Sequence, residues 1–376
     1  MKLVSLSQVS HLLYPGVTLA WSVRDANGTL LLAKGHVLAD ERAVQTLLDR
    51  GMFIDAAEIA AAAAANRAEA PKDESMSGRW SGLENRLGTL LKSSTEPNFL
   101  QKVRESVVSI AALADGNVDL LIFLILRHDY KRVANYSVVH ALHSAALCSL
   151  LTRRLGWPEP KRYSVLGAAL TMNISMLELQ NNLAIRTLKP SDAERQVIAE
   201  HPTVSATMLR DAGLADVDWL TTVEQHHERR DGKGYPLGLT DSTEMSRLLN
   251  FVDTFTAKHS PRAGRTPQPA HRAARDLFTH SGGDPLAALV IKEFGIYPPG
   301  CYVRLASGEV AIVVQRGASA NAPIVAAITN KNGDSLTQPV RRDTSTPANA
   351  IAATVAEELI RVRVSVDRLY EQKTNR

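Results

Sequence analysis

Apolar residues recur at helical spacing through the middle of the chain, from about residue 80 to residue 292. The stretch NVDLLIFLILRHD predicts a short and almost wholly apolar helix, and NYSVVHALHSAALCSLLTRRLGW predicts a long one that ends near Gly156. The stretch KRYSVLGAALTMNISMLEL predicts a further helix with one buried face. No internal repeat is visible, so we expect residues 77–296 to form one helical domain.

Shorter runs with the alternation of strands lie on both sides of this domain. Near the N-terminus, WSVRDANGTLLLAKG predicts two strands joined by a hairpin at Asn27-Gly28, and ADERAVQTLLDRG predicts a helix. Residues 1–58 are therefore expected to form a small α+β module. The segment 59–76, rich in Ala, Ser and Pro, indicates a helical or flexible linker.

The chain after FGIYPPG changes character again. The runs CYVRLASGEVAIVVQRG, APIVAAITN and IRVRVSV are separated by Gly and Asn turns and predict a small antiparallel β sheet or barrel over residues 297–370. The predicted fold class is therefore mainly α, with a helical domain flanked by a small N-terminal α+β module and a small C-terminal antiparallel β module.

The composition is that of an ordinary globular protein, with 376 residues, 45% apolar and 22% charged, enough for two or three packed units. The net charge of +4 is spread without a basic block, which gives weak support for an anionic ligand and argues against a nucleic acid polymer. Cys148 and Cys301 lie far apart, as in a reduced protein without disulfides. Since no run reaches about 18 apolar residues and no secretory leader is visible, we expect a cytoplasmic protein that does not contact a membrane.

The stretch QHHERRDGKGYPLG, residues 225–238, places two histidines before a glycine-rich turn. Consecutive residues on a helix point about 100° apart, so His226 and His227 can aim at one centre only where a helix ends or bends. The turn at Gly232 and Gly234 predicts such an end. Histidine is the commonest metal ligand near neutral pH, so the pair favours a divalent Mn, Fe, Ni, Co or Zn ion, although such pairs are also typical of surfaces and helix caps.

This stretch resembles the signature of the HD-GYP family, His-His-Glu-x-x-Asp-Gly-x-Gly-Tyr-Pro. Every fixed position is met, by His226, His227, Glu228, Asp231, Gly232, Gly234, Tyr235 and Pro236. The resemblance extends over roughly residues 120–290 and implies an all-helical HD-type phosphohydrolase domain that hydrolyses cyclic di-GMP with two or three metal ions. In such a centre, neighbouring cations activate a water and neutralise charge on the phosphodiester.

The resemblance implies five metal ligands in this chain. They are His140, His201, His226, His227 and Asp253. Without the family, His140 is better explained as a core histidine, and His201-Pro202 as a helix start. Asp253 lies among apolar neighbours, where an unpaired carboxylate is costly, so a metal, arginine or histidine partner is expected.

The His-Asp dyad that gives the superfamily its name is missing. The family reads Gly-Ala-Ala-x-x-His-Asp-Ile-Gly-Lys, whereas this chain reads GAALTMNISM, with Met172 and Asn173 at the dyad. A neutral asparagine is a poor replacement for a carboxylate that bridges two mutually repelling cations, and methionine sulfur is too soft for a hydrolytic cation. His201, His226 and His227 still suffice for one ion with an open position. We therefore expect one divalent metal ion or none, with iron or manganese favoured over zinc.

Further residues resemble the ligand-binding parts of the family. Beyond Asp253 the chain keeps Arg262 and Arg265, which suit a phosphate and, with Asp231, are the predicted ligand contacts.

The glycine-rich turn itself has two explanations. Its residues Gly232, Gly234, Tyr235 and Pro236 either shape the backbone alone, or present an exposed tyrosine to a protein partner. In the family this loop is associated with binding of GGDEF domains.

The leading hypothesis is an HD-GYP protein of bacterial cyclic di-GMP signalling with weak or absent hydrolysis. The alternatives are a non-catalytic sensor of a cyclic dinucleotide, and an adaptor that docks proteins such as GGDEF domains through the Tyr235 loop. Hydrolysis of a different phosphate ester and assembly into oligomers also stay open.

Overall fold

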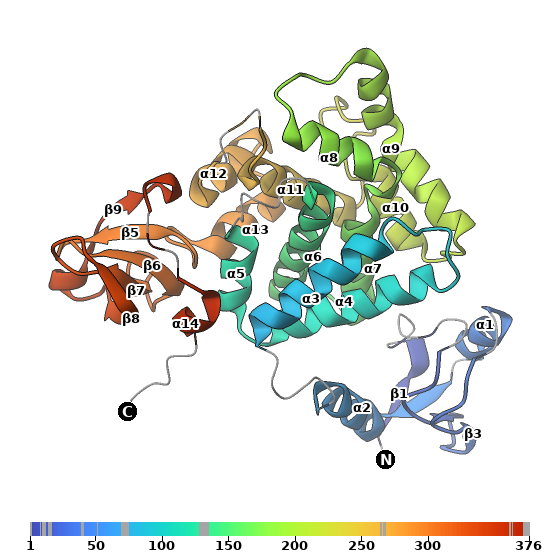
Figure 1. Ribbon diagram of the computed structural model, residues 1–376. Helices are drawn as coiled ribbons and strands as arrows, with labels where there is room; N and C mark the ends of the chain where they lie inside the picture. Colours follow the sequence, from blue (N-terminus) through green and yellow to red (C-terminus); the bar gives the residue numbers. More distant parts are fainter. Residues whose placement is uncertain are drawn as a thin grey trace.

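The computed structural model describes residues 2–7, 9, 13, 17–38, 41–50, 52–68, 75–127, 135–263, 265, 268–360, 362 and 364–370. Figure 1 shows a central body of helices, with a small sheet from the start of the chain and another from its end lying at separate edges of that body. The predicted fold class, mainly α with two small antiparallel sheets, is confirmed.

The N-terminal sheet has four antiparallel strands in the order β1-β4-β2-β3. Its elements are β1 (Leu3–Ser5), β2 (Val23–Arg24), β3 (Leu30–Leu32), α1 (Glu41–Asp49) and β4 (Phe53–Asp55). The predicted hairpin at Asn27-Gly28 joins β2 to β3, and Gly28 has the positive φ of 85° that such a turn requires. Trp21, Val23 and Ile54 lie in the small core of this sheet.

A helix follows this sheet without a break. Helix α2 (Ala56–Ala68) begins directly after β4, so it crosses the predicted module boundary at residue 58. The predicted linker is helical as far as residue 68, and residues 69–74 of it lie outside the described residues.

The helical body begins at Met76 and carries one continuous core, which includes Leu87, Val107, Leu147 and Leu249. Its helices are α3 (Met76–Leu90), α4 (Phe99–Asp115), α5 (Val118–Leu126), α6 (Tyr136–Arg154), α7 (Glu159–Thr171), α8 (Leu177–Ile185), α9 (Asp192–Asp211), α10 (Val217–Gln225), α11 (Glu244–His259), α12 (Ala270–His280) and α13 (Pro285–Phe294). The predicted apolar helix and the long helix that follows it correspond to α5 and α6.

The third predicted helix is wrong as a single element, because it breaks between α7 and α8 at Asn173. Asn173 has φ −113° and ψ 15°, outside the helical range, and its carbonyl accepts from Met176 in the short 3₁₀ turn Ile174–Met176. The backbone N–H of Ser175 donates to the hydroxyl of Ser205 on α9 instead of to a helical carbonyl. Asn and Ser have low helix propensity, so this tertiary contact decides where the helix stops.

A single glycine sets how closely α10 packs on α7. A Cβ atom on Gly167 would lie 2.4 Å from the indole ring of Trp219, and the indole Nε1 donates to Thr171 Oγ1 at 2.9 Å. Only glycine leaves room for this ring, which fixes α10 and the residues that follow it.

The C-terminal sheet is open and has five antiparallel strands in the order β8-β7-β6-β5-β9. The strands are β5 (Tyr302–Leu305), β6 (Val310–Gln315), β7 (Ile324–Thr329), β8 (Ser335–Asp343) and β9 (Ile351–Val355). The strand predicted at IRVRVSV is wrong, because Ile360, Val362 and Val364 have no strand structure. Their side chains instead pack irregularly on the sheet, whose edge beside β5 is already taken by β9, and α14 (Val366–Tyr370) follows.

The C-terminal sheet is fastened to the helical body (Figure 1). Phe123 of α5 lies in the core of the sheet, where its ring meets Tyr370 edge-on at 5.5 Å between centroids. Arg316, at the end of β6, donates to Asp119 at 2.5 Å and to the buried Glu293 at 3.2 Å. An apolar contact and a buried ion pair therefore join the two parts.

Among the described helices, none alone has both the length and the apolar content of a membrane span. Helices α4 and α5 reach that length and apolar content only when they are taken together, and the chain bends by 117° between them.

Candidate metal centre

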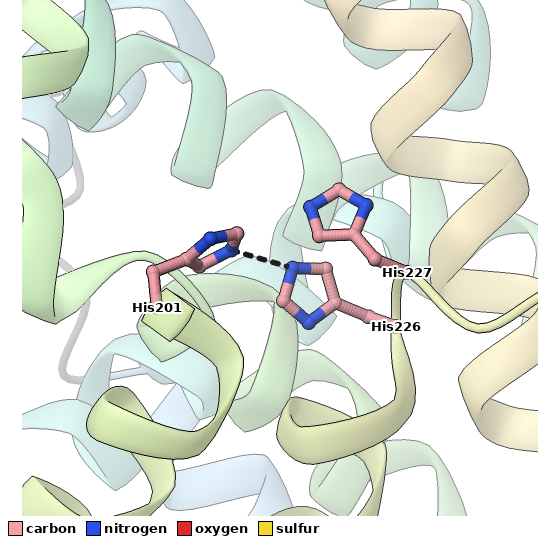
Figure 2. A group of neighbouring side chains, drawn as sticks. All are labelled: His201, His226 and His227. Atoms are coloured by element: carbon pink, nitrogen blue, oxygen red, sulfur yellow. Dashed lines mark hydrogen bonds between the residues drawn. The ribbon is translucent and has the colours of Figure 1, made fainter. Parts of the chain in front are cut away.

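Three histidines from two parts of the helical body converge on one point (Figure 2). His201 comes from α9, whereas His226 and His227 follow the end of α10 at Gln225. One ring nitrogen from each lies within 4.8 Å of the others. Helix α10 thus ends at the histidine pair, as expected, and both rings lie in the cluster.

The proline after His201 determines how that ring is held. The sequence suggests that His201-Pro202 starts a helix. In the structure the two residues instead lie in the middle of α9, which begins at a capping box of Ser191 and Glu194. Because proline has no N–H, it leaves the carbonyl of Ile198, four residues earlier, without its helical donor. His201 Nδ1 donates to that carbonyl at 2.6 Å, which directs Nε2 toward the cluster.

His226 is held in a similar way by the end of α10. The last carbonyls of a helix have no intrahelical donor. His226 Nδ1 donates to one of them, that of Val223, at 2.6 Å, while Asn250 Nδ2 donates to the carbonyl of His226 at 2.7 Å. Two carbonyls without a helical donor, one because of a proline and one because the helix ends, thus fix the imidazoles of His201 and His226.

The resulting geometry suits a cation. His201 Nε2 and His226 Nε2 lie 3.2 Å apart, and with both Nδ1 atoms donating to carbonyls, each Nε2 presents a lone pair to the other. Two nitrogens about 2.1 Å from one ion and 3.2 Å apart subtend about 100°, close to tetrahedral and octahedral angles. The imidazoles of His201 and His226 therefore fit a divalent metal ion, and a ring nitrogen of His227 lies within 4.8 Å of both.

Burial keeps these imidazoles neutral. It lowers the pKa of His201 to about 3 and holds the pKa values of His226 and His227 below the ordinary 6.5. The charge of Asp253 opposes this shift at all three rings, so the carboxylate lies close enough to act on the cluster. A neutral imidazole is the form that binds a metal.

The other two predicted ligands, His140 and Asp253, bind each other. His140 Nε2 lies 2.7 Å from Asp253 Oδ1, so the carboxylate has the histidine partner that was one of its expected partners. Burial raises the pKa of Asp253, but the hydrogen bond and charge of His140 outweigh it and hold that pKa below its usual range. The structure thus separates the five predicted ligands into a cluster of three and a pair.

Tyr136, which the sequence analysis did not assign, and Arg262, a predicted phosphate contact, support this pair. The ring of Tyr136 stacks on His140 at 5.4 Å between centroids, and its hydroxyl lies 3.4 Å from His140 Nδ1. Arg262 donates from Nη2 to the same hydroxyl and lies 4.5 Å from the centre of that ring. Tyr136 precedes His140 by four residues, the spacing of neighbours on a helix, which was a signal in the sequence.

The dyad positions have different surroundings. Met172 is buried in the core of the helical body. Asn173 is 6% exposed, and its Oδ1 is a buried acceptor without a hydrogen-bond donor among the described residues. Ser175 ties this segment to α9, because its hydroxyl donates to the carbonyl of His201 at 3.2 Å. Asn173 therefore offers one unused oxygen on a segment attached to a cluster histidine.

The two predicted phosphate contacts lie after α11. Arg262 has a buried Nε without a partner, and Arg265 is exposed, donating to the carbonyl of Ala257. Among the described residues neither arginine forms an ion pair. Donors of Arg262 are therefore still unused beside the His140 pair.

The glycine-rich loop is held by the glutamate of the motif, a role that the sequence analysis did not assign. Glu228 is buried and accepts from the backbone N–H groups of Leu237 and Leu239 at 2.8 and 2.7 Å. A Cβ on Gly234 would lie 2.5 Å from the backbone nitrogen of Arg229, so only glycine fits there. The loop therefore folds tightly back on the residues after His227.

Two loop residues differ from their expected roles. Tyr235 is half-buried rather than exposed, because its ring stacks on His227 at 4.5 Å between centroids. Asp231, a predicted ligand contact, is exposed, and its carboxylate accepts hydrogen bonds from Nε and Nη2 of Arg229 at 3.0 and 2.6 Å. Gly232 and Pro236 shape the turn, through a positive φ of 68° and a cis Tyr235–Pro236 bond.

Comparison with known proteins places this site in context. A family model described as HD domain matches residues 121–285. The chain is similar to the cyclic di-GMP phosphodiesterase PA4108 of Pseudomonas aeruginosa, with 28% identity over 248 residues, 62% of this chain and 60% of that protein. It is also similar to 3'3'-cGAMP-specific phosphodiesterase 3 of Vibrio cholerae, with 26% identity over 175 residues, 45% of this chain and 38% of that protein. The match thus spans less than two thirds of each of these relatives.

Among solved structures, a similar chain is that of Bd1817, an HDGYP protein from Bdellovibrio bacteriovorus. The two share 18% sequence identity with a TM-score of 0.49, over 77% of this chain and 97% of the other.

Proposed function

Because this chain belongs to the HD-GYP family of HD-domain proteins, we propose that it binds a cyclic dinucleotide at a site with one divalent metal ion, and that hydrolysis there is weak or absent. The names of its relatives give cyclic di-GMP and 3'3'-cGAMP as what they act on, which supports the ligand class.

The observation that carries this proposal is the three-histidine cluster beside a segment without the His-Asp dyad. His201, His226 and His227 would hold the ion, and three protein ligands leave a position open. An ion bound there would acidify a water and offset charge on a phosphate oxygen. A second ion would need His140 and Asp253, which bind each other, and the dyad positions, which hold Met172 and Asn173.

Arg262 and Arg265 are the proposed phosphate contacts. A guanidinium has five donors, and Arg262 uses one of them for the hydroxyl of Tyr136, while its buried Nε has no partner among the described residues. A phosphate oxygen supplies the acceptor that this nitrogen lacks. Since neither arginine forms an ion pair with a described residue, their charge is available to an anion.

The first test combines elemental analysis of the purified protein with cyclic di-GMP binding by calorimetry and a turnover assay. We expect one metal ion per chain, binding, and little or no linear product. Arg262→Ala should weaken binding about 10-fold or more, the value of a charged hydrogen bond. Arg272→Ala, an exposed arginine on α12, is the matched control and should not change the affinity.

The possible results separate the alternatives. Two ions per chain with rapid turnover would contradict the impaired site. An affinity unchanged by Arg262→Ala would remove the phosphate contact. A protein that binds neither ion nor nucleotide would favour the adaptor.

An adaptor role has one observation in its favour. Leu237, in the loop after the cis proline, is 74% exposed, so its apolar side chain is accessible to a protein partner. If the loop docks a GGDEF domain, Leu237→Ser should abolish capture of a purified GGDEF domain while leaving the metal content unchanged. Equal capture by the parent protein and by Leu237→Ser would exclude Leu237 from the contact.

A further inference from the structure

Resting on the proposed single-metal site, we propose that the three-histidine cluster selects Zn²⁺ over Mn²⁺, in contrast to the iron or manganese expected from the family resemblance. This preference depends on which donor atoms of the chain can reach an ion and which are bound elsewhere.

The donors that converge are all of one kind. His201, His226 and His227 supply three imidazole nitrogens and no oxygen. Imidazole suits Zn²⁺, Cu²⁺, Ni²⁺ and Fe²⁺, whereas Mn²⁺ prefers carboxylate, carbonyl and water oxygens. For a fixed set of nitrogen donors, affinity rises from Mn²⁺ toward the end of the row, so a purely nitrogen site disfavours Mn²⁺ most.

The carboxylates near the cluster are engaged by other partners. Asp253 binds His140 at 2.7 Å, and Glu228 accepts two backbone N–H groups of the loop. Asp231 forms a bidentate pair with Arg229. An acid that left such a hydrogen bond to reach an ion would lose about 1–3 kcal/mol per bond. Asp253 would approach the ion through Oδ2 only within the reach that its Oδ1 bond to His140 allows.

The dyad positions bring no negative charge to the cluster. Asn173 stands where the family has an aspartate, and its Oδ1 lacks a donor among the described residues. Even if this oxygen joins the three nitrogens, it brings no charge. These four donors are therefore neutral, and Asp at this position would add the hard anionic oxygen that Mn²⁺ favours.

The test measures metal affinity without any nucleotide. Metal-free full-length protein is titrated with Zn²⁺ and with Mn²⁺ against a chromophoric chelator, with folding checked by circular dichroism. We expect one site per chain, with Zn²⁺ bound at least about 100-fold more tightly than Mn²⁺. In Asn173→Asp, the Mn²⁺ affinity should rise at least about 10-fold and the preference for Zn²⁺ should narrow.

Two more variants keep the result specific to the cluster. His227→Gln should weaken Zn²⁺ binding about 10-fold or more, whereas His280→Gln, an exposed histidine on α12, should leave it unchanged. Cobalt supplies an independent readout, because Co²⁺ on three imidazoles gives visible absorption that His227→Gln should reduce.

Failure of this inference differs from failure of the proposed function. If one ion binds per chain and Mn²⁺ matches or exceeds Zn²⁺, the selectivity is wrong and the single-metal site stands. If neither ion binds stoichiometrically, or His227→Gln has no effect, the site itself is wrong and the selectivity falls with it.

Discussion

The carbonyl of Ile198, which has no helical N–H donor, orients the imidazole of His201. Pro202 cannot supply the helical N–H, and the imidazole of His201 takes its place at 2.6 Å. In metal sites, the group that binds the second ring nitrogen of a histidine fixes which nitrogen faces the ion. Here that group is a peptide oxygen inside the same helix, three residues away.

Pro202→Ala tests this arrangement. Alanine restores the N–H, which then competes with His201 for the carbonyl of Ile198, so the ring loses its fixed orientation. We expect metal affinity to fall about 10- to 100-fold while the thermal unfolding midpoint stays or rises, since α9 gains a hydrogen bond. Val204→Ala, an exposed position on the same helix, serves as control. Unchanged affinity in the proline variant would show that the carbonyl does not orient the ring.

Sequence reasoning found the right histidines but not their grouping. The convergence of His226 and His227 depends on neighbours in the chain, and the two rings lie in one cluster with His201. The separation of His140 and Asp253 from that centre depends on a contact between α6 and α11, residues 113 apart. No local spacing encodes such a contact, whereas the stacking of Tyr136 on His140 follows from their four-residue spacing on α6.

The loop from Glu228 to Leu239 works as one unit. The carboxylate of Glu228 holds two of its N–H groups, and Gly234 lets the chain pass within contact of the backbone behind it. The N–H of Tyr235 then donates to the carbonyl of His227 at 3.2 Å, and its ring covers that histidine. The conformation of the loop therefore supports one of the three cluster ligands.

Gly234→Ala should disrupt this unit. Its Cβ would lie 2.5–2.6 Å from three backbone atoms, which cannot move independently, so the loop must shift and Tyr235 must leave His227. We expect a loss of about 2 kcal/mol in stability and weaker metal binding, measured by thermal unfolding and metal titration. Gly88→Ala, where the nearest atom is 3.9 Å away in the last turn of α3, should keep or raise stability. Equal behaviour of the two variants would contradict the steric argument.

Helices with long apolar periods could be predicted well, and short elements less so. The break at Asn173 and the irregular path of Val362 and Val364 both follow from tertiary contacts that override a local pattern. In the first case the hydroxyl of a serine on another helix accepts from a backbone N–H, and in the second the valine side chains pack on the core of the sheet.

The helical body and the C-terminal sheet share interior contacts. Glu293 is 4% exposed and accepts from Arg316 of the sheet and from Arg154 of α6 at 2.8 Å. The sequence predicts both parts and their fold class, but not that they are joined, because the partners lie far apart along the chain. We expect the two parts to unfold together.

Arg316→Ala measures this coupling. The change leaves Asp119 without its close partner and removes one of two cations from the buried Glu293. Since Arg316 is about one-third exposed, we expect a loss of about 2 kcal/mol, below the range for a fully buried pair, together with faster proteolysis between α13 and β5. Arg304→Ala on the exposed face of β5 is the control. If both variants unfold like the parent, the ion pairs do not hold the sheet in place.

The position of Phe123 also has a consequence for synthesis of the chain. Its ring lies in the core of a sheet whose first strand begins at Tyr302, and α5 ends at Leu126, a separation of 302 − 126 = 176 residues. At about 5–20 residues per second, a ribosome needs roughly 10–35 s to cover that interval. During that time one side of the most apolar helix has no cover, which gives a chaperone that recognises apolar segments a defined window on the nascent chain.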